Sequence, residues 1–320
     1  MLDTLSDVLR AVRLTGAVFF SVDASAPWVA EAPASNAVGP EVLPAAEHVI
    51  AYHVITAGTC WGGLIDEPAI KLEAGDIIVF PQGDAHVISS APGMRGAPHY
   101  EAFREARSRN TPLAVAIHGG APRHEQVVCG YLGCDARPFN PLLATLPRMM
   151  HLRAESADDP LHRLLKLAVA EASEPRAGGE CVLSKLSELL FVEVVLRYVA
   201  QLPAEGVGWF AGLRDENIGI ALQKLHERPA HDWTLEGLGK ACGLSRSVLA
   251  ERFAHLVGVP PMQYLAQWRI QLAASLLRTG KASLAEIAER VGYGSEAALS
   301  RAFKRHVGVA PAHYRRREVA

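Results

Sequence analysis

The hydrophobic positions of the C-terminal third follow a helical period. Leu235, Leu238 and Cys242 are spaced as on one face of a helix, and Gly243 stands where that helix should end. Ser245 is a residue that caps helix starts, and the stretch "RSVLAERFAHLV" after it again has a helical apolar face. A helix, a short turn with glycine and a second helix predict a helix-turn-helix unit.

The same unit returns fifty positions later. "SLAEIAERVGYGS" and "EAALSRAFKRHV" repeat the two helices, with Gly292 at the turn and Ser295 at the second cap. The positions that recur unchanged are Leu249, Phe253, Val257, Gly258, Val259, Pro261 and Tyr264, which return as Leu299, Phe303, Val307, Gly308, Val309, Pro311 and Tyr314. These are residues of a core and of turns, so we expect the residues that differ between the copies to face a partner. A plain helical bundle is the alternative.

The N-terminal half has a different pattern, with short β-branched runs separated by glycine and proline. "YHVITAGTCWGGL", "AIKLEAGDIIVFP", "AHVISS", "LAVAIHGG" and "QVVCGYLG" are typical of strands. Short strands at even spacing predict a barrel or jelly roll. Between the halves, "LHRLLKLAVAEAS" and "CVLSKLSELLFVEVVLRYVAQL" predict two helices. The second has a wide apolar stripe, formed by Leu183, Leu186, Leu190, Val194 and Tyr198 and broadened by Leu189, Val192, Val195 and Val199.

Charge separates the same two parts of the chain. The net charge of the 320 residues is −2, but residues 214–320 hold 16 Lys+Arg against 10 Asp+Glu, and the remainder holds 16 against 24. A basic third on an acidic body predicts a polyanion as partner. No apolar run is long enough to span a membrane, and the N-terminus does not resemble a signal peptide. Five cysteines without a disulfide pattern fit the cytoplasm.

The stretch "AEIAERVGYGSEAALSRAFKRHVGVAPAHYR" resembles the signature of the AraC family of bacterial transcription regulators almost throughout. The resemblance implies two helix-turn-helix units joined by a long helix, here "PMQYLAQWRIQLAASLLRTG". Each unit then places one recognition helix in the major groove, and successive grooves on one face of DNA are about 34–36 Å apart. Two units on a rigid spacer therefore read two halves of one site.

Residues near the start of each recognition helix reach base edges. The candidates are Arg246, Ser247, Ala250 and Glu251 in the first unit, and Glu296, Ala297, Ser300 and Arg301 in the second. By resemblance, Ser247, Ala250 and Glu251 match base-reading places of the family. Arg301 can bind guanine in a bidentate way, Glu can accept from cytosine, and Ala can touch a thymine methyl. Lys304 and Arg305 are expected on phosphates, as are Arg315, Arg316 and Arg317, and Arg246 fits either role. The alternative for each is a solvated surface position.

The motif "GDIIVFPQGDAH" places Gly75, Pro81, Gly83 and His86 as in the second half of the cupin signature. The region from about Leu5 to Pro147 resembles the cupin-type sensor domain of one branch of the AraC family. The first half of the signature is incomplete, because "EHVIAYHVITAG" lacks the usual His-x-His followed by Glu. We therefore expect no enzyme. The alternative is a metal-dependent cupin enzyme fused to a DNA-binding domain.

Two histidines and two cysteines form a candidate metal site: His53, His86, Cys129 and Cys134. If they converge, they suit zinc or another divalent metal in a tetrahedral site. Residues 129 and 134 face opposite ways in a regular strand, so convergence requires a break at Gly130 or Gly133. The alternatives are buried structural cysteines with a satisfied core histidine, or a thiol switch.

Together these patterns predict an α+β multidomain chain. We expect a cupin-like jelly-roll sensor at 1–150, a helical segment at 151–205, a linker at 206–216 and a tandem helix-turn-helix domain at 217–320. The resemblance implies that the helical segment dimerises the protein; the alternative is that its helices only pack on the barrel. The expected function is a cytoplasmic, sequence-specific transcription regulator, an activator by resemblance, that responds to a small molecule, a metal or a redox signal. The expected partners are promoter DNA, RNA polymerase, a second copy and an effector, with no membrane.

Overall fold

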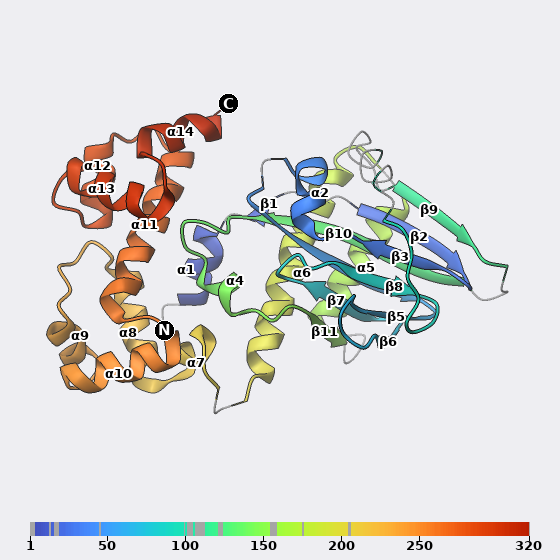
Figure 1. The fold of residues 1–320 in the computed structure, drawn as a ribbon, viewed down its shortest axis with the longest axis horizontal. Helices are drawn as coiled ribbons and strands as arrows, with labels where there is room; N and C mark the ends of the chain where they lie inside the picture. The colour runs from blue at the N-terminus through green and yellow to red at the C-terminus, as the bar shows by residue number, and fades with distance from the viewer. Residues whose placement is uncertain are drawn as a thin grey trace. The chain divides into compact units, whose positions relative to one another are not determined.

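The computed structural model describes residues 4–12, 14–15, 19–44, 46–98, 100, 105, 113–120, 124–153, 159–174, 176–203 and 206–319. The chain forms two compact units (Figure 1). The barrel unit contains Arg13–Asp135 and Leu146–Gln201. The helical unit contains Met1–Val12, Ala136–Thr145 and Leu202–Ala320. Sheets in one unit and helices in the other give the mixed α+β fold expected from the sequence.

The barrel unit has two sheets. The larger one has the strand order β11 (Met150–Arg153), β7 (Asp76–Phe80), β4 (His48–Ala57), β10 (His124–Cys134), β2 (Phe19–Ser25) and β9 (Leu113–His118), and β1 (Leu14–Thr15) also pairs with β10. The smaller one has the order β3 (Val29–Ala32), β8 (His86–Ser89), β5 (Thr59–Leu64) and β6 (Ile70–Glu73). Helix α2 (Ser35–Val42) contacts β4. Among the strands that the structure describes, β2 and β9 pair in parallel, and the other pairs are antiparallel.

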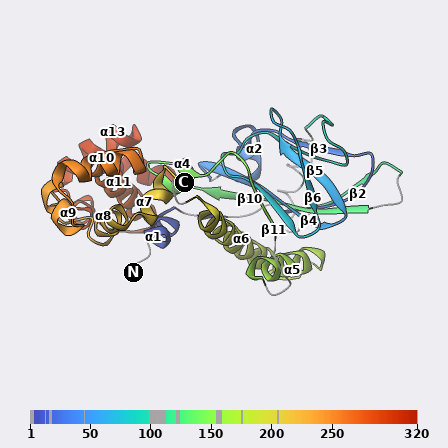
Figure 2. The same cartoon turned by 90° about the horizontal axis from the view of Figure 1, so that it is seen from below.

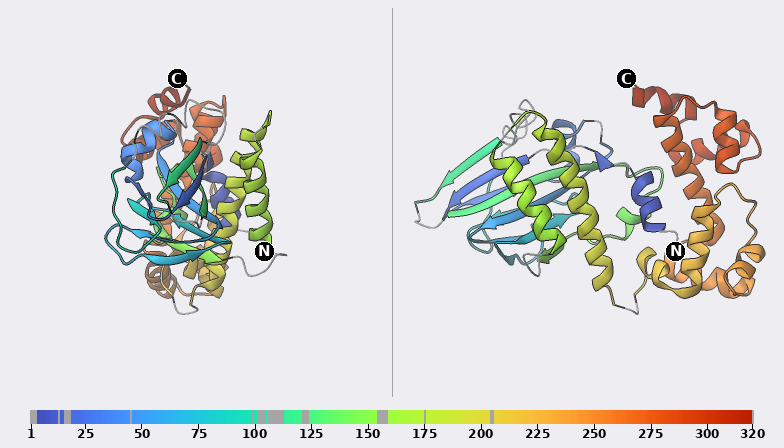
Figure 3. Two further views of the ribbon diagram at one scale, coloured as in Figure 1. Left: turned by 90° about the vertical axis from the view of Figure 1, so that its right-hand side faces the viewer. Right: turned by 180° about the vertical axis from the view of Figure 1, so that it is seen from behind.

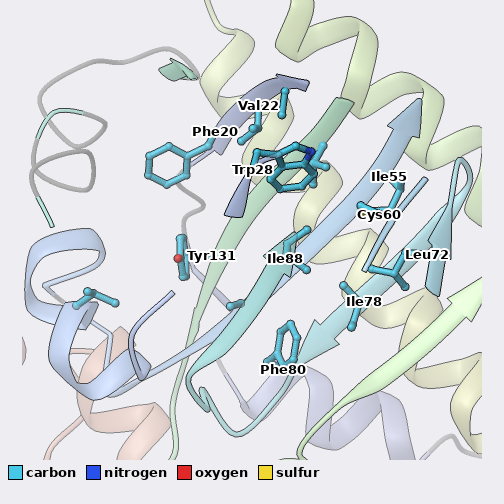
Figure 4. Packing of buried hydrophobic residues seen from close by; sticks show 14 of the residues in the cluster. Phe20, Val22, Trp28, Ile55, Cys60, Leu72, Ile78, Phe80, Ile88 and Tyr131 are labelled. Carbon is cyan, nitrogen blue, oxygen red and sulfur yellow. The ribbon is translucent and has the colours of Figure 1, made fainter. Parts of the chain in front are cut away.

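Strand β4 shows why alternation of apolar and polar residues is a weak indicator of strands in this unit. Its residues 49–55 are buried on both faces, as in a strand covered on two sides. Ala51 and Ile55 point into the core between the sheets, which also contains Phe20, Trp28, Phe80 and Tyr131 (Figure 4). Tyr52 points to the other face, where its hydroxyl lies 2.8 Å from Oγ of Ser187.

Helices α5 (Pro160–Ser173) and α6 (Gly179–Gln201) run side by side over one face of the larger sheet (Figures 2 and 3). The stripe predicted for α6 is buried at Leu183, Leu186, Leu190 and Val194, while Tyr198 is half-buried. Packing of α6 on the barrel therefore uses this stripe. Leu189 and Leu196, in contrast, are exposed.

The helical unit contains α1 (Thr4–Ala11), α4 (Pro141–Thr145), α7 (Trp209–Arg214), α8 (Glu216–Glu227) and α9 (Leu235–Ala241). They are followed by α10 (Arg246–Val257), α11 (Pro261–Thr279), α12 (Leu284–Val291), α13 (Glu296–Val307) and α14 (Pro311–Val319). Two observations differ from the expected domain boundaries. The segment expected as a linker holds α7, whose Trp209 and Phe210 are buried, and residues 1–12 and 136–145 belong to the helical unit. The hydrophobic periodicity of a segment shows that it has an apolar face, but it does not show against which core that face packs.

Among the described residues, the structure has no helix that is both long and apolar enough to cross a membrane.

Candidate DNA-binding surface and sensor cluster

The two predicted helix-turn-helix motifs are α9 with α10 and α12 with α13. In both, a serine caps the second helix: Ser245 accepts from the N–H of Val248, and Ser295 accepts from the N–H of Ala298. Gly243 and Gly292, which lie in the turns, have φ of 74° and 84°. This backbone conformation favours glycine. Helix α11 connects the motifs over the range predicted from the sequence.

The recurring residues of the two copies form equivalent cores. Phe253 and Phe303 are fully buried, and each ring packs edge-on against the tyrosine that follows in its copy. The ring centroids are 5.7 Å apart for Phe253 and Tyr264, and 5.3 Å apart for Phe303 and Tyr314. The prediction that repetition marks core and turn positions is confirmed.

The residues that differ between the copies lie mostly on the surface. Of the candidate DNA contacts, the exposed ones are Arg246, Ser247, Glu251, Glu296, Ala297, Arg301, Lys304 and Arg305, and the half-buried ones are Ala250 and Ser300. All lie on α10 or α13. The first turns of both helices therefore present a mixture of charged, hydroxyl and small side chains to a partner.

Sequence reasoning missed Val248 in the first turn of α10. It is 46% exposed, an unusual position for a large apolar side chain on a helix that buries Leu249 and Phe253. An apolar side chain here suits a thymine methyl group. The signal was its place directly after Ser247 in the first turn of the recognition helix.

The barrel unit brings three of the four candidate metal ligands together. His53 on β4 is paired with Cys129 on β10, and the His53 Nδ1 lies 2.8 Å from the Cys129 Sγ. His86 comes from β8 in the other sheet, and its Nε2 lies 2.8 Å from Nε2 of His53. The two histidines therefore meet between the sheets, because β4 and β8 belong to different sheets and are not neighbouring strands.

The hydrogen bonds of this cluster have one consistent direction. The Nδ1 of His86 lies 2.8 Å from the carbonyl oxygen of Asp84, and a carbonyl can only accept, so this nitrogen carries the proton. In neutral His86 the Nε2 is then an acceptor, and Nε2–H of His53 donates to it. The Nδ1 of His53 accepts in turn from the Cys129 thiol. The result is a relay from Cys129 through His53 and His86 to the backbone of Asp84.

Burial keeps every member of the relay uncharged. It lowers the pKa of His86 to about 4, against the weaker opposing effect of the Asp84 carbonyl. It also lowers the pKa of His53, with a further contribution from His86. The pKa of the Cys129 thiol is raised by burial and by Cys60. At neutral pH the cluster is thus a thiol and two neutral imidazoles.

Residues of the cupin-like motif hold the ring of His86 in place. The ring of Phe80 stacks on His86 with 3.8 Å between the centroids and meets His53 edge-on. Gly83 has a φ of 70°, and a Cβ there would lie 2.7 Å from Cβ of Ser35. The motif therefore fixes the ring of His86 and requires glycine where α2 docks on the turn.

The structure does not bring Cys134 to this cluster. Strand β10 stays in register with β4 from Val127 to Cys134, so neither Gly130 nor Gly133 breaks it. Cys134 pairs with His48, five residues along β10 from Cys129, and an odd spacing in a regular strand places the two thiols on opposite faces. Among the described residues, no three His, Cys, Asp or Glu side chains have the arrangement of a metal site.

The two histidines of the cluster are the remaining candidates for binding a metal. The Nε2 atoms of His53 and His86 lie 2.8 Å apart, and each Nδ1 lies 2.8 Å from an atom that is able to accept a hydrogen bond, the Cys129 sulfur or the Asp84 carbonyl. Metal-ligating histidines commonly donate their other N–H to such acceptors. A change of tautomer at His53 would free both Nε2 lone pairs, but the two rings would also have to separate. Nitrogens that bind one zinc ion at about 2.0–2.1 Å each in a tetrahedral site lie farther apart than the 2.8 Å seen here. Two imidazoles are a donor set that suits zinc once the rings separate, and the four-ligand site of the sequence prediction does not form here.

Comparison with known proteins agrees with both units. Residues 3–200 match a family described as Cupin, and residues 238–317 match one described as Helix-turn-helix domain. The chain is 31% identical to a putative AraC-like transcription regulator from Streptomyces lividans, over 98% of both chains. It is 28% identical to the HTH-type transcriptional regulator AlkR from Acinetobacter baylyi, over 98% of this chain and 99% of AlkR. The solved DNA-binding domain of AdpA in complex with a target DNA is 33% identical, with a TM-score of 0.31, over 32% of this chain and 92% of that one.

A tandem helix-turn-helix with two exposed recognition helices, fused to a cupin domain, defines a DNA-binding transcription regulator. The chain belongs to the family of AraC-like transcription regulators.

Proposed function

We propose that this regulator activates transcription by reading a two-part promoter site with α10 and α13, under the control of the barrel unit as a sensor. The observation that supports sensing is the relay of Cys129, His53 and His86. It is a buried cluster of polar groups that can bind a metal or react, where a purely structural barrel needs only apolar side chains. The cytoplasm is the proposed location, because promoter DNA is there. Activation rests on the family resemblance, with RNA polymerase as the further partner.

In the proposed complex, base edges are read by Ser247, Val248, Ala250 and Glu251 from α10, and by Glu296, Ala297, Ser300 and Arg301 from α13. Their placement on the first two turns supports this role, because a recognition helix reaches bases with its N-terminal residues. Lys304 and Arg305 lie further along α13 and are proposed on phosphates, which position the protein without reading sequence. Arg246 is proposed at the edge of the site, on a phosphate or a base.

The proposed dimer uses an exposed seam of α6. We define the heptad seam as Val182, Lys185, Leu189, Val192, Leu196 and Val199, whose spacings alternate between three and four residues. Val182, Leu189 and Leu196 are 36%, 53% and 46% exposed. Five apolar residues with coiled-coil spacing fit a copy of the same helix, because a two-fold interface pairs one surface patch with itself.

A test of the dimer replaces Leu189 and Leu196 with glutamate. We expect wild-type protein to sediment with the mass of two chains and the double variant with the mass of one, because buried carboxylates without partners oppose association. Val207→Glu is the matched control, since Val207 is 69% exposed and lies outside α6. A double variant that remains a dimer at the same concentration contradicts the proposed interface.

The proposed signal at the cluster is zinc or another divalent metal bound by Nε2 of His53 and His86. His53 of β4 and His86 of β8 would hold the ion, which would supply positive charge between the two sheets. Cys129 then accepts the N–H of His53 Nδ1 and keeps that ring oriented.

The metal proposal is tested on untagged protein purified under reducing conditions, dialysed after addition of zinc. We expect about one zinc ion per chain in the wild type, its loss in His53→Ala and His86→Ala, and affinity reduced by about 10–100-fold in Cys129→Ser. Cys134→Ser is the matched control and should keep its zinc, because Cys134 lies away from the cluster. Wild-type protein without metal after this treatment contradicts a metal signal and leaves a thiol reaction at Cys129 or an organic effector.

A further inference from the structure

Two segments distant in sequence complete the core of the helical unit. In α1, Leu5 and Val8 are buried, and in the segment 136–145, Leu142 and Leu143 are buried. Helix α1 contacts α8 and α11, while α4 contacts α7. Neither segment belongs to the tandem helix-turn-helix motif. The motif therefore packs against two segments that are adjacent to barrel strands in the sequence.

Gln271 on α11 holds both segments at once. Its side chain is fully buried. The Oε1 accepts from the backbone N–H of Phe139 at 3.1 Å, and the Nε2 donates to the carbonyl of Ala11 at 3.2 Å. Ala11 is the last residue of α1, where carbonyls lack a partner in the helix. An amide buried in an apolar core is costly unless both of its ends are bonded, and here each end is bonded to a different segment.

Phe139 connects this segment to a second set of contacts. Its ring meets Tyr264 of α11 edge-on, with the centroids 5.3 Å apart. The Tyr264 hydroxyl accepts from Nε1–H of Trp209 and donates to Nε2 of His226, which burial keeps neutral by lowering its pKa to about 3. One network thus joins the segment 136–145 to α7, α8 and α11.

The segment 136–145 directly follows the strand that carries Cys129. Strand β10 carries Cys129 of the sensor cluster, ends at Cys134, and is followed within two residues by the segment 136–145. The chain passes between the two units four times, after residues 12, 135, 145 and 201. The segment 136–145 lies between two of these connections, so it is joined to barrel strands at both of its ends.

We propose that the segment 136–145 transmits changes from β10 to the DNA-binding motif, and that Gln271 is the positioning residue that keeps it on α11. The first turns of α10 and α13 are exposed while the segment 136–145 is in place, so the segment does not cover the proposed DNA-reading surface. In this proposal the segment affects how the helix-turn-helix motifs are oriented. The proposal rests on the sensor role of the barrel unit, but on no particular signal.

Because coupling between two sites is reciprocal, DNA itself can serve as the ligand in a test. The assay measures hydrogen exchange of the full-length chain, with and without a duplex that the protein selects from a random pool. In the wild type, DNA should change exchange in β10, residues 126–134. In Gln271→Met, which keeps the volume but loses both hydrogen bonds, this change should disappear. Exchange at 139–143 should become about tenfold faster without DNA.

Gln267→Met is the matched control. Gln267 lies one turn earlier on α11, and its side-chain oxygen has no hydrogen-bond partner. This control should behave as the wild type, and Gln271→Met should still bind the duplex with similar affinity. The proposal is overturned if DNA leaves β10 unchanged in the wild type, if Gln271→Met keeps the full response, or if it no longer binds the duplex, since that result shows a purely structural role. Zinc binding is measured in a separate experiment, so failure of the metal proposal can be distinguished from failure of the coupling proposed here.

Discussion

Arg301→Ala should remove most of the preference for the selected DNA site while binding to unrelated DNA persists. Arg301 is exposed on the second turn of α13, where an arginine can donate two hydrogen bonds to guanine. Loss of one bidentate contact costs about 1–3 kcal/mol of discrimination, or roughly 5–150-fold. Fluorescence anisotropy with the selected duplex and a scrambled duplex at one salt concentration measures this ratio.

Arg305→Ala is the control for Arg301. Arg305 is also exposed on α13 but lies one turn further along, where a phosphate contact is expected. Its loss should weaken binding to both duplexes equally and reduce the salt dependence by about one unit of slope. If Arg301→Ala loses the same affinity for both duplexes, Arg301 contacts the DNA phosphate backbone and not a base.

Phe303→Ala should destabilise the second helix-turn-helix motif by about 3–5 kcal/mol. Phe303 is fully buried in a cluster with Ile287, Val291, Leu299 and Tyr314. Removing the ring leaves a cavity between α12, α13 and α14 and removes the edge-on contact with Tyr314. Denaturant unfolding and hydrogen exchange in α12 and α13 measure the effect, and specific DNA binding should fall with it.

Lys304→Ala is the neighbouring control, since Lys304 is exposed on the same helix. It should change the unfolding free energy by less than about 0.5 kcal/mol. A loss below about 1 kcal/mol for Phe303→Ala would mean that the motif repacks, and it would contradict the view that the recurring residues form a tight core.

The repeated C-terminal pattern could be interpreted from sequence because its information is local. Serine caps, turn glycines and buried phenylalanines lie within a few residues of the elements that they shape, so the order of helices and the exposed positions on α10 and α13 followed directly. The cupin-like motif behaved in the same way: Gly75 and Gly83 have positive φ, and His86 is buried.

The cluster of His53, His86 and Cys129 was only partly predictable from the sequence. His53, His86 and Cys129 were chosen for their chemistry, and strand parity alone already opposed Cys134. What sequence could not show was that β4 and β8 face each other from different sheets, since that pairing depends on closure of the whole barrel. The direction of the relay depends on the Asp84 carbonyl, a backbone group that no residue type indicates.

By itself the sequence determined the family, the tandem motif and the presence of a barrel, because periodicity, caps and turn residues act over short distances. Only the tertiary structure decided that residues 1–12 and 136–145 complete the helical unit, and that Gln271 joins them through backbone groups 132 and 260 positions away. The apolar face of a short helix fits many cores. Which core it joins depends on the free energy of the complete packing arrangement, not on the residues of that helix alone.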